Sequence, residues 1–367
     1  MSERIGTVQL IQKMNRVLVL DRLRAGGEMS RAELSAETGM SLASITNIVK
    51  YLAECGYVRE VGTVATSKAG RRTELLAFNQ TAGELAVVHV EANEVYFARC
   101  DLLGSILEQG CMPTLVAQSG AVMETVRQVL SKIVNERTLG VGVAISGHVD
   151  NRGAVSSVQL NWDGYPVREK LLAEGFPNVF VVNNSRSKAM GLSEPIVDGV
   201  FLDLSDGLGL VRFLGGRVDE GVSGELGHTT VMKDGPLCAC GNYGCLEKVV
   251  SPGYLQKQFG GNLERMLEAY ENGERVPALV EAAEYLGIGL ANVISLFEPP
   301  CIVINPNCMT KKDRFYHSVL EYAQRRLGRL SLRRVMYLRS EVTHEAALAG
   351  LARHVADGIF GVDGNVV

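Results

Sequence analysis

The stretch GELGHTTVMKDGPLCACGNYGCLE, residues 224–247, gathers metal-binding side chains within a short span. It contains Cys238, Cys240 and Cys245, and His228 precedes them. Thiolate sulfur and imidazole nitrogen are ligands that suit a tetrahedral, structural zinc ion. Chance cysteines or a redox switch are the alternative, but a cysteine cluster beside a histidine in a reducing compartment is more often a metal site. We therefore predict a structural Zn²⁺ site with the ligands His228, Cys238, Cys240 and Cys245.

The composition is that of a folded protein with two or three domains. The chain has 367 residues, 46% of them hydrophobic, and a net charge of −4. This charge gives no global sign of nucleic-acid binding, so any such contact must come from a local patch. No apolar run approaches the roughly 20 residues that cross a bilayer, and the N-terminus lacks the pattern of a signal peptide. Scattered cysteines outside the cluster fit a reducing compartment, so we expect a cytoplasmic protein.

The N-terminal residues carry the signals of a helix-turn-helix. Ser30 and Glu33 form a capping box before a short helix that Gly39 ends, and Ser41 caps the next helix. Two short helices joined by a tight turn that contains glycine are typical of this DNA-binding unit. The second helix places an apolar stripe inward: Leu42, Ile45, Ile48, Val49 and Leu52. Its opposite side is small and polar, and we expect DNA contacts in the major groove from Ser41, Ser44, Thr46, Asn47 and Lys50.

A basic hairpin is predicted to follow these helices. Residues 57–61 and 73–78 have the composition of strands, and the segment between them holds Lys68, Arg71 and Arg72. Arginine at a hairpin tip can contact phosphates or enter a narrow minor groove. The alternative is a helical dimerisation domain with a solvated basic loop. We favour a winged helix-turn-helix domain over residues 1–80.

The rest of the chain predicts an α/β body with two lobes. Strand-like runs, a helical segment and further strands occur first over residues 81–190 and again over residues 191–367. Such alternation is typical of α/β domains. We expect the second lobe to carry the zinc loop and the C-terminal helices. A cleft between two lobes is where a small ligand binds.

These motifs together resemble the ROK family of bacterial sugar kinases and sugar-responsive repressors. GELGH at residues 224–228 resembles the family's ExGH motif, and CACGNYGCLE at residues 238–247 resembles its zinc signature, CxCGxxGCxE. NWDGYPVREKL at 161–171 and YLGIGLANVISLFEPPCIVI at 285–304 resemble two further family segments. The resemblance covers nearly the whole chain and implies an actin/hexokinase-like fold. The N-terminal winged domain is what distinguishes the family's repressors from its kinases.

The segments that resemble the kinase motifs lack the residues that phosphoryl transfer to a sugar hydroxyl requires. ROK kinases carry an Asn-Asp pair in which the Asp is the base, and the corresponding pair here is Asn183-Asn184. An amide cannot accept a hydroxyl proton at neutral pH. The segment that resembles the first phosphate loop, residues 89–93, lacks its glycines and contains Glu91, and Asn305-Pro306 replaces a Gly-Gly pair. We therefore expect no kinase activity and no catalytic residue.

The sugar-binding side of the resemblance is better preserved. Acidic and amide groups suit a polyol, because each hydroxyl both donates and accepts. The resemblance implies sugar contacts from Asn183, Asn184, Glu225, His228 and Glu247. Ser146-Gly147 stands where family members commonly have Pro-Gly.

Two cations depart from the family pattern in the same region. Arg186 and Lys188 stand where the family has small or amide residues. Such a pair could favour an acidic or phosphorylated ligand. Charged side chains usually face solvent, however, so we expect solvent exposure for both.

Three functions follow, in order of preference. The first is a transcriptional regulator, expected to be a repressor of carbohydrate metabolism, which binds operator DNA as a homodimer or dimer of dimers and responds to a sugar or sugar derivative. The second is a ROK sugar kinase with an appended DNA-binding domain. The third is a repressor in which a protein partner replaces the small-molecule effector.

Overall fold

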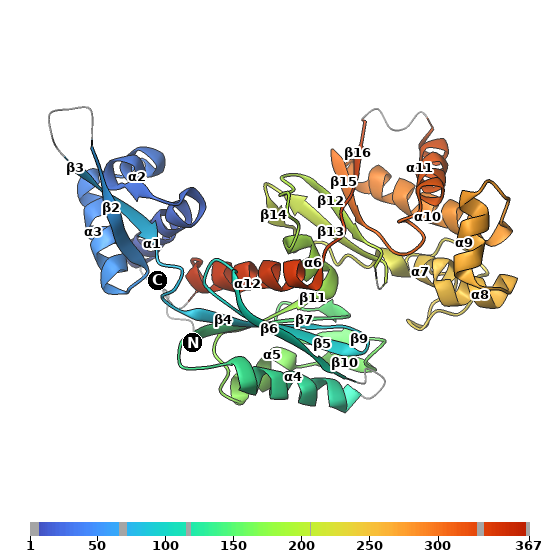
Figure 1. The fold of residues 1–367 in the computed structure, drawn as a ribbon, viewed down its shortest axis with the longest axis horizontal. Coiled ribbons are helices and arrows are strands. Elements are labelled where there is room, and N and C mark those ends of the chain that lie inside the picture. Colours follow the sequence, from blue (N-terminus) through green and yellow to red (C-terminus); the bar gives the residue numbers. More distant parts are fainter. Residues whose placement is uncertain (1–6, 66–71, 115–118, 206, 329–333, 365–367) are drawn as a thin grey trace.

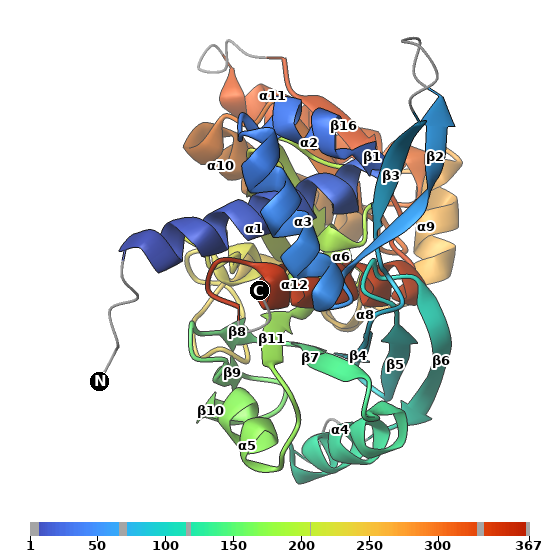
Figure 2. The same ribbon diagram turned by 90° about the vertical axis from the view of Figure 1, so that its left-hand side faces the viewer.

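The structure, a computed structural model, describes residues 7–65, 72–114, 119–205, 207–328 and 334–364. Figure 1 shows three parts in a row: the N-terminal domain at one end, a first lobe in the middle and a second lobe at the other end. The same parts are seen end-on in Figure 2. The two lobes form the α/β body that the sequence predicts.

The N-terminal domain is a helix-turn-helix with a β-hairpin. Its elements are α1 (Thr7–Gly26), β1 (Met29–Ser30), α2 (Arg31–Thr38), α3 (Leu42–Glu54), β2 (Val58–Ala65) and β3 (Arg72–Phe78). The Ser30–Glu33 capping box forms as predicted, and the Ser41 side chain caps α3 by accepting from the Ser44 backbone N–H. The turn between α2 and α3 uses Gly39 at φ 71°, a conformation that glycine adopts without strain. β1, β3 and β2 form one antiparallel sheet.

The inward stripe of α3 is shorter than predicted. Ile45, Val49 and Leu52 are buried against the other helices, and Ile48 is partly buried. Leu42 is 55% exposed, so its inward placement was wrong. All of residues 41–44 are exposed, so the part of α3 that packs on the domain core begins only at Ile45.

The first lobe is built on a five-stranded sheet in the order β11-β7-β4-β5-β6. β11, β7 and β4 are parallel, while β5 and β6 run antiparallel to their neighbours. One face carries α4 and α5, and a small sheet in the order β10-β9-β8 packs beside them. The elements are β4 (Glu84–Val90), β5 (Glu94–Cys100), β6 (Ile106–Pro113), α4 (Ser119–Ile133), β7 (Thr138–Ile145), β8 (His148–Val149), β9 (Val155–Ser157), β10 (Trp162–Tyr165), α5 (Val167–Ala173) and β11 (Val179–Asn183).

The second lobe has its own five-stranded sheet, in the order β14-β13-β12-β15-β16. Helices pack on one face of it around a continuous apolar core. Its elements are β12 (Gly199–Asp203), β13 (Gly209–Leu214), β14 (Arg217–Val218), η1 (Leu226–His228), α7 (Leu246–Val250), α8 (Pro252–Phe259), α9 (Leu263–Glu271), α10 (Pro277–Phe297), β15 (Cys301–Asn305), α11 (Asp313–Leu327) and β16 (Met336–Arg339). By length and composition alone α10 could cross a membrane, but glutamates interrupt its apolar sequence and 56% of its apolar window is buried inside the protein.

The C-terminal helix does not belong to the second lobe, contrary to the division at residue 191. α12 (His344–Phe360) returns to the first lobe and covers the sheet face opposite α4, as Figure 1 shows. Leu351 and Val355 of α12 share one buried cluster with Leu85 and Val87 of β4. Burial of this apolar face decides the placement, and a one-dimensional pattern does not reveal which sheet a helix will cover.

A short helix between the lobes links them to α12. α6 (Asn184–Met190) buries Ala189 against Phe201 of the second sheet, and its Ser187 hydroxyl donates to the Ala347 carbonyl of α12 at 3.0 Å. Where α6 ends, Gly350 lies so close to Gly191 that a Cβ on Gly350 would fall 2.5 Å from the Gly191 nitrogen. Glycine at both positions therefore permits backbone-to-backbone packing of the two helices.

Candidate functional site

The zinc ligands predicted from the sequence lie together in the structure. The donor atoms of His228, Cys238, Cys240 and Cys245 all lie within 4.8 Å of one another. His228 Nδ1 is 3.8 Å from Cys238 Sγ, and Cys240 Sγ is 3.6 Å from Cys245 Sγ. Sulfur atoms bonded to one tetrahedral zinc ion are about 3.8 Å apart, given Zn–S bonds of about 2.3 Å. The spacing of the donors therefore fits such an ion.

The protonation of the thiols supports the same reading. Burial, together with hydrogen bonds to the other two thiols, raises the pKa of Cys245 to about 12. For Cys240, hydrogen bonds from Asn242 and from the neighbouring thiols outweigh burial and lower the pKa. The Cys245 thiol thus keeps its proton and donates it in a hydrogen bond to the sulfur of Cys240. Several thiolates can coexist in this position when a cation replaces the shared protons.

The loop that holds the cluster is ordered by its own backbone. Isolated β-bridges join Thr230 to Cys245 and Leu237 to Tyr243, and the Cys238 N–H donates to the Asn242 carbonyl at 2.7 Å. Gly244 has φ 65°, and a Cβ there would meet the Met232 carbonyl. Cys245 is the N-cap of α7, so the cluster is attached directly to a helix of the second lobe.

A cavity of about 410 Å³ lies between the two lobes, with the cysteine cluster in one wall. Its first-lobe wall comes from segments at the ends of β4, β7 and β9, and its second-lobe wall from the β12–β13 turn and the loop that carries the cysteine cluster. All of the predicted sugar-binding residues line it: Asn183, Asn184, Glu225, His228 and Glu247. The cavity also contains Ser157 and Gln159, which sequence reasoning missed because no motif marks their loop.

The two asparagines have different environments. Asn183 caps α6 by accepting from the Ser185 N–H at 2.8 Å, and it donates to the Gly147 carbonyl at 2.7 Å. Asn184 donates to the Val90 carbonyl at 2.8 Å, while its Oδ1 is buried without a hydrogen-bond partner in the described part of the chain. A buried acceptor without a donor is costly. Asn184 therefore has an acceptor oxygen at the cavity wall that no described group satisfies, whereas both polar ends of Asn183 are bonded to the backbone.

Two acidic residues, Glu225 and Glu247, flank the loop that carries the cysteine cluster on the second-lobe wall. Glu225 Oε2 lies 3.9 Å from His228 Nε2, on the side of the ring away from Cys238. A carboxylate in this position can orient a metal-bound imidazole. Glu247 accepts from the Leu208 N–H at 3.1 Å, and so joins the start of α7 to the turn before β13.

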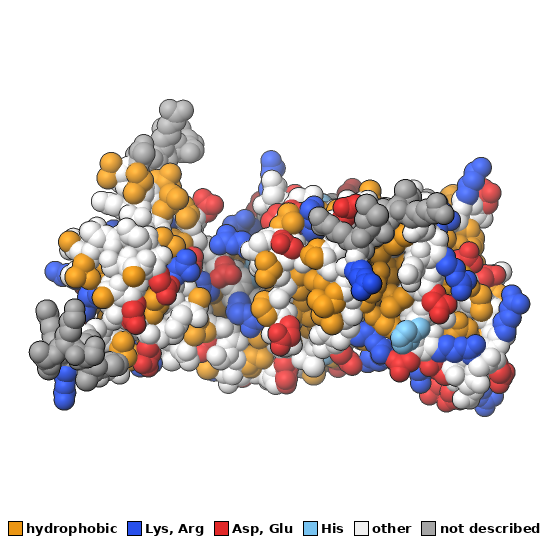
Figure 3. Space-filling view, turned by 90° about the horizontal axis from the view of Figure 1, so that it is seen from above, with side chains coloured by type: hydrophobic (Ala, Val, Ile, Leu, Met, Phe, Trp, Pro, Cys, Tyr) orange, Lys and Arg blue, Asp and Glu red, His pale blue; other side chains and the backbone are white. Residues whose placement is uncertain are grey.

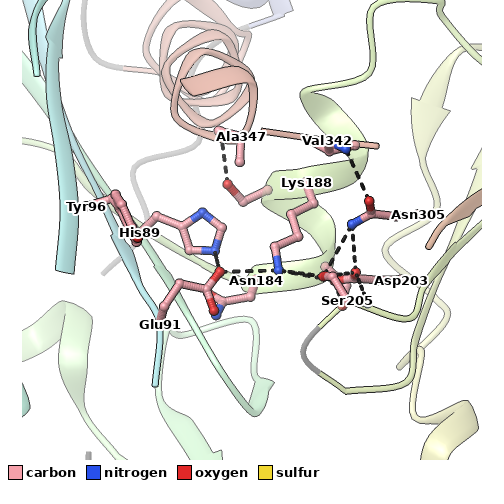
Figure 4. Close-up of polar contacts among 12 residues, drawn as sticks. His89, Glu91, Tyr96, Asn184, Lys188, Asp203, Ser205, Asn305, Val342 and Ala347 are labelled. Atoms are coloured by element: carbon pink, nitrogen blue, oxygen red, sulfur yellow. Dashed lines mark hydrogen bonds and ion pairs between the residues drawn. The ribbon is translucent and has the colours of Figure 1, made fainter. Parts of the chain in front are cut away.

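Lys188 is buried in the structure, which corrects the expectation that it faces solvent. Its side chain is only 5% exposed, and its Nζ lies 3.2 Å from Glu91 and 3.8 Å from Asp203. Figure 4 shows the ammonium group between these two carboxylates, with Ser205 beside it at 2.9 Å. The physical reason is that two carboxylates from different lobes converge where α6 begins, and a cation between them compensates their charge.

The carboxylates around Lys188 are themselves fixed. His89 Nε2 lies 3.1 Å from Glu91. Burial would raise the pKa of Glu91, but the interactions with His89 and Lys188 outweigh it and lower the pKa to about 2. Asp203 accepts from Ser205 at 2.6 Å and from Asn305 at 2.9 Å, and Asn305 in turn accepts from the Val342 N–H at 3.1 Å. Sequence reasoning noted Glu91 and Asn305 only as losses, and it missed their place in this network.

Arg186, the other cation of α6, is also paired. It donates to Glu220 at 2.8 Å and to the Val222 carbonyl at 3.3 Å, and its side chain is 19% exposed. The expectation that it faces solvent therefore holds only in small part. The guanidinium lies at the cavity wall but is bonded to the segment after β14.

The predicted DNA-contacting residues of α3 are all exposed. They comprise the N-cap and exposed side chains of the helix: Ser41, Ser44, Thr46, Asn47 and Lys50. The Ser41 hydroxyl caps the helix and Thr46 donates to the Leu42 carbonyl at 2.7 Å, so both have backbone partners. Arg72 is exposed at the start of β3, while Lys68 and Arg71 lie outside the described residues.

Family profiles match both parts of the chain. The ROK family profile matches residues 91–357, and the profile of the IclR helix-turn-helix domain matches residues 17–62. The second match coincides with α1 to β2, and the first with the two lobes and α12. The domain order that the sequence predicts is therefore confirmed.

Curated relatives align over most of the chain. The chain is 24% identical to the xylose repressor of Caldicellulosiruptor bescii over 88% of its own length and 90% of the relative's. It is also 24% identical to the DNA-binding transcriptional dual regulator NagC of Escherichia coli, over 97% of its own length and 96% of the relative's.

A solved structure matches the whole arrangement. It is a ROK family transcriptional regulator described as a homologue of the Escherichia coli MLC protein, with a TM-score of 0.78 and 24% identity. The match covers 95% of this chain and 97% of that one, so it includes the N-terminal domain as well as both lobes. The fold is thus that of this regulator, and the profile match over most of the chain identifies the wider group. The chain belongs to the ROK family.

Proposed function

We propose that this protein is a DNA-binding transcriptional regulator of carbohydrate metabolism, which responds to a sugar or sugar derivative bound between its lobes. One observation carries the proposal: a winged helix-turn-helix domain with an exposed polar helix is joined by α12 to a two-lobed body with a polar cavity. Relatives named as a xylose repressor and as a DNA-binding transcriptional regulator align with the chain over 90% and 96% of their own length. Such a regulator would act in the cytoplasm, where its operator is accessible.

The cavity supports a polyhydroxylated ligand. It offers amide, hydroxyl and carboxylate groups, including Asn184, Ser157, Glu225 and Glu247. Each ligand hydroxyl needs both a donor and an acceptor, and the buried Asn184 oxygen lacks a donor in the described part of the chain. A neutral sugar would supply one.

Relatives named as repressors support a function other than catalysis. We further propose that phosphoryl transfer is lost, because Asn184 cannot act as the base and the segment that resembles the first phosphate loop presents the carboxylate of Glu91, which is paired with Lys188. The kinase alternative is decided by incubating the protein with Mg·ATP and a panel of hexoses. Turnover above that of an Asn184→Ala variant would contradict the proposal.

The zinc ion is proposed as a structural element of the effector site. His228, Cys238, Cys240 and Cys245 would hold it, and it would supply a rigid link between the loop of residues 229–245 and α7. Glu225 and Glu247 flank this loop, so their positions in the cavity would depend on it. No catalytic role is assigned to the metal.

The proposal predicts a homodimer, or a dimer of dimers, on DNA with two half-sites. Symmetric dimers bind palindromic operators, with half-sites separated by whole helical turns. Electrophoretic mobility shifts with DNA upstream of the protein's own gene test this directly. Failure to bind that region or neighbouring intergenic regions at low salt would contradict it. Binding without any response to sugars would instead favour a protein partner as the effector.

A further inference from the structure

The interlobe cavity carries more acidic than basic side chains. Among the described residues that line it, the carboxylates are Glu91, Asp203, Glu225 and Glu247, whereas the lysine and arginine side chains are only Lys188 and Arg186. The acidic residues lie on both sides of the cavity. An anionic ligand would therefore be close to carboxylates on either side of the cavity.

Both cations already have anionic partners within the protein. Lys188 lies between Glu91 at 3.2 Å and Asp203 at 3.8 Å, as Figure 4 shows. Arg186 is bonded to Glu220 at 2.8 Å. A ligand phosphate would have to displace one of these carboxylates, and the displaced carboxylate would then be left buried without its cation.

The opposite wall offers no positive side chain in exchange. In the part of the chain that the structure describes, no lysine or arginine pairs with Glu225 or Glu247; His228 approaches Glu225 at 3.9 Å, and a backbone N–H donates to Glu247. A zinc ion held by three thiolates would leave this wall with no excess of positive charge. The carboxylates on this wall can accept hydrogen bonds from ligand hydroxyl groups, but they would repel an anionic ligand.

We propose that the cavity selects an uncharged or cationic polyhydroxyl ligand and rejects its phosphorylated or carboxylated form. This inference rests on the proposed function, and it specifies the chemical class of the effector. It also excludes the acidic ligand that Arg186 and Lys188 suggest in the sequence. Phosphoryl transfer to a ligand hydroxyl is then the class of reaction that removes the signal, because the product no longer fits the charge of the site.

Calorimetric titration of the full-length, zinc-loaded protein tests the proposal with matched pairs. The probes are glucose, N-acetylglucosamine and xylose, the corresponding sugar phosphates, and inorganic phosphate. We expect one neutral sugar to bind, its phosphate ester to bind at least about 100-fold more weakly, and inorganic phosphate not to bind. An ester that binds as tightly as its parent sugar, or more tightly, would overturn the proposal.

A charge-neutral variant separates this proposal from the sugar-effector proposal. Glu91→Gln leaves Lys188 with fewer carboxylates, so inorganic phosphate affinity should rise at least about tenfold. The control is Glu321→Gln, which removes the same charge from an exposed site on α11 and should change nothing. Glu225→Gln serves as a second variant if Glu91→Gln is unstable, and it should also raise phosphate affinity.

The outcomes are distinguishable. If no neutral sugar binds but Glu91→Gln gains phosphate binding, the sugar effector is wrong while the charge selection holds. If neither variant binds inorganic phosphate more tightly than wild type does, the charge selection is wrong whatever the effector is.

Discussion

The ammonium group of Lys188 lies 3.2 Å from the carboxylate of Glu91, and this contact joins α6 to the end of the first-lobe strand β4. Through Asp203, 3.8 Å from the same ammonium, the contact extends to the second-lobe sheet. One buried cation, Lys188, therefore compensates the negative charge of a carboxylate from each lobe. Since α6 also bonds to α12 through Ser187, changes in the cavity have a short physical route to the helix that packs against the winged domain.

Removing the Lys188 charge should destabilise the body strongly. Lys188→Met keeps most of the side-chain volume but leaves Glu91 and Asp203 buried without their cation, which costs about 3–5 kcal/mol. The measurement is the free energy of unfolding in urea. The control is Lys311→Met, because Lys311 forms an ion pair of 2.7 Å with Glu341 on the surface, where such pairs contribute at most about 1 kcal/mol. Equal effects of the two substitutions would contradict the role of Lys188.

The contribution of Glu91 should disappear in acid. Its pKa is lowered in the folded protein to about 2 from an ordinary value of 4.5, despite burial, by His89 on β4 and Lys188 on α6. A lowered pKa stabilises the folded state above the unfolded value, and this stability is lost as pH falls from about 5 towards 2. The difference in unfolding free energy between wild type and Glu91→Gln should shrink by about 3 kcal/mol over that range. If the difference in unfolding free energy does not change with pH, the titration of Glu91 does not contribute to the loss of stability in acid.

Loss of one thiolate should release the metal. Cys238→Ser is expected to lower zinc content well below one ion per chain, as measured by elemental analysis of protein purified without chelator. The loop of residues 229–245 should then become accessible to protease. Cys308→Ser is the matched control, because Cys308 is exposed and outside the cluster. Full zinc content in Cys238→Ser would mean that the ligand set is wrong.

Local signals in the sequence predicted the elements well, but not the long-range pairing of charges. The Ser30–Glu33 box and the Cys238–Cys245 cluster depend on residues close together in the chain, so spacing was enough to predict them. Lys188 is different: its partners come from strands far apart in sequence, and a lone lysine gives no sign of them. The position of α12 was missed for the same reason, because its apolar face would suit either sheet.

The exposed face of α3 should supply operator specificity, and its lysine mainly affinity. Asn47→Ala is expected to weaken binding to the operator by about 1–3 kcal/mol while leaving non-specific DNA binding nearly unchanged. Lys50→Ala should weaken both and should reduce the slope of log K against log salt by about 1. Fluorescence anisotropy at several salt concentrations measures the affinity for operator DNA, the affinity for non-specific DNA and the salt dependence of both. Lys257→Ala, on the exposed side of α8, is the control and should change neither.

The contact between Phe360 and the winged domain should carry the response to ligand. The Phe360 ring lies 5.1 Å from that of Tyr57 and 5.7 Å from that of Phe78, and Arg24 bonds to Asp357 at 2.7 Å beside it. A ligand changes DNA affinity only if it favours one arrangement of body and DNA-binding domain over another. Without this contact, the winged domain would no longer follow the position of α12.

Phe360→Ala should therefore separate DNA binding from ligand binding. We expect the variant to lose about 3–5 kcal/mol of stability and, where still folded, to bind both operator and sugar without either affecting the other. Phe315→Ala is the matched control: that ring is equally buried but lies in the second lobe, against Tyr270. Its stability should fall similarly, while the effect of sugar on operator affinity persists. If Phe360→Ala still responds to the sugar as wild type does, the coupling passes through another contact between α12 and the winged domain.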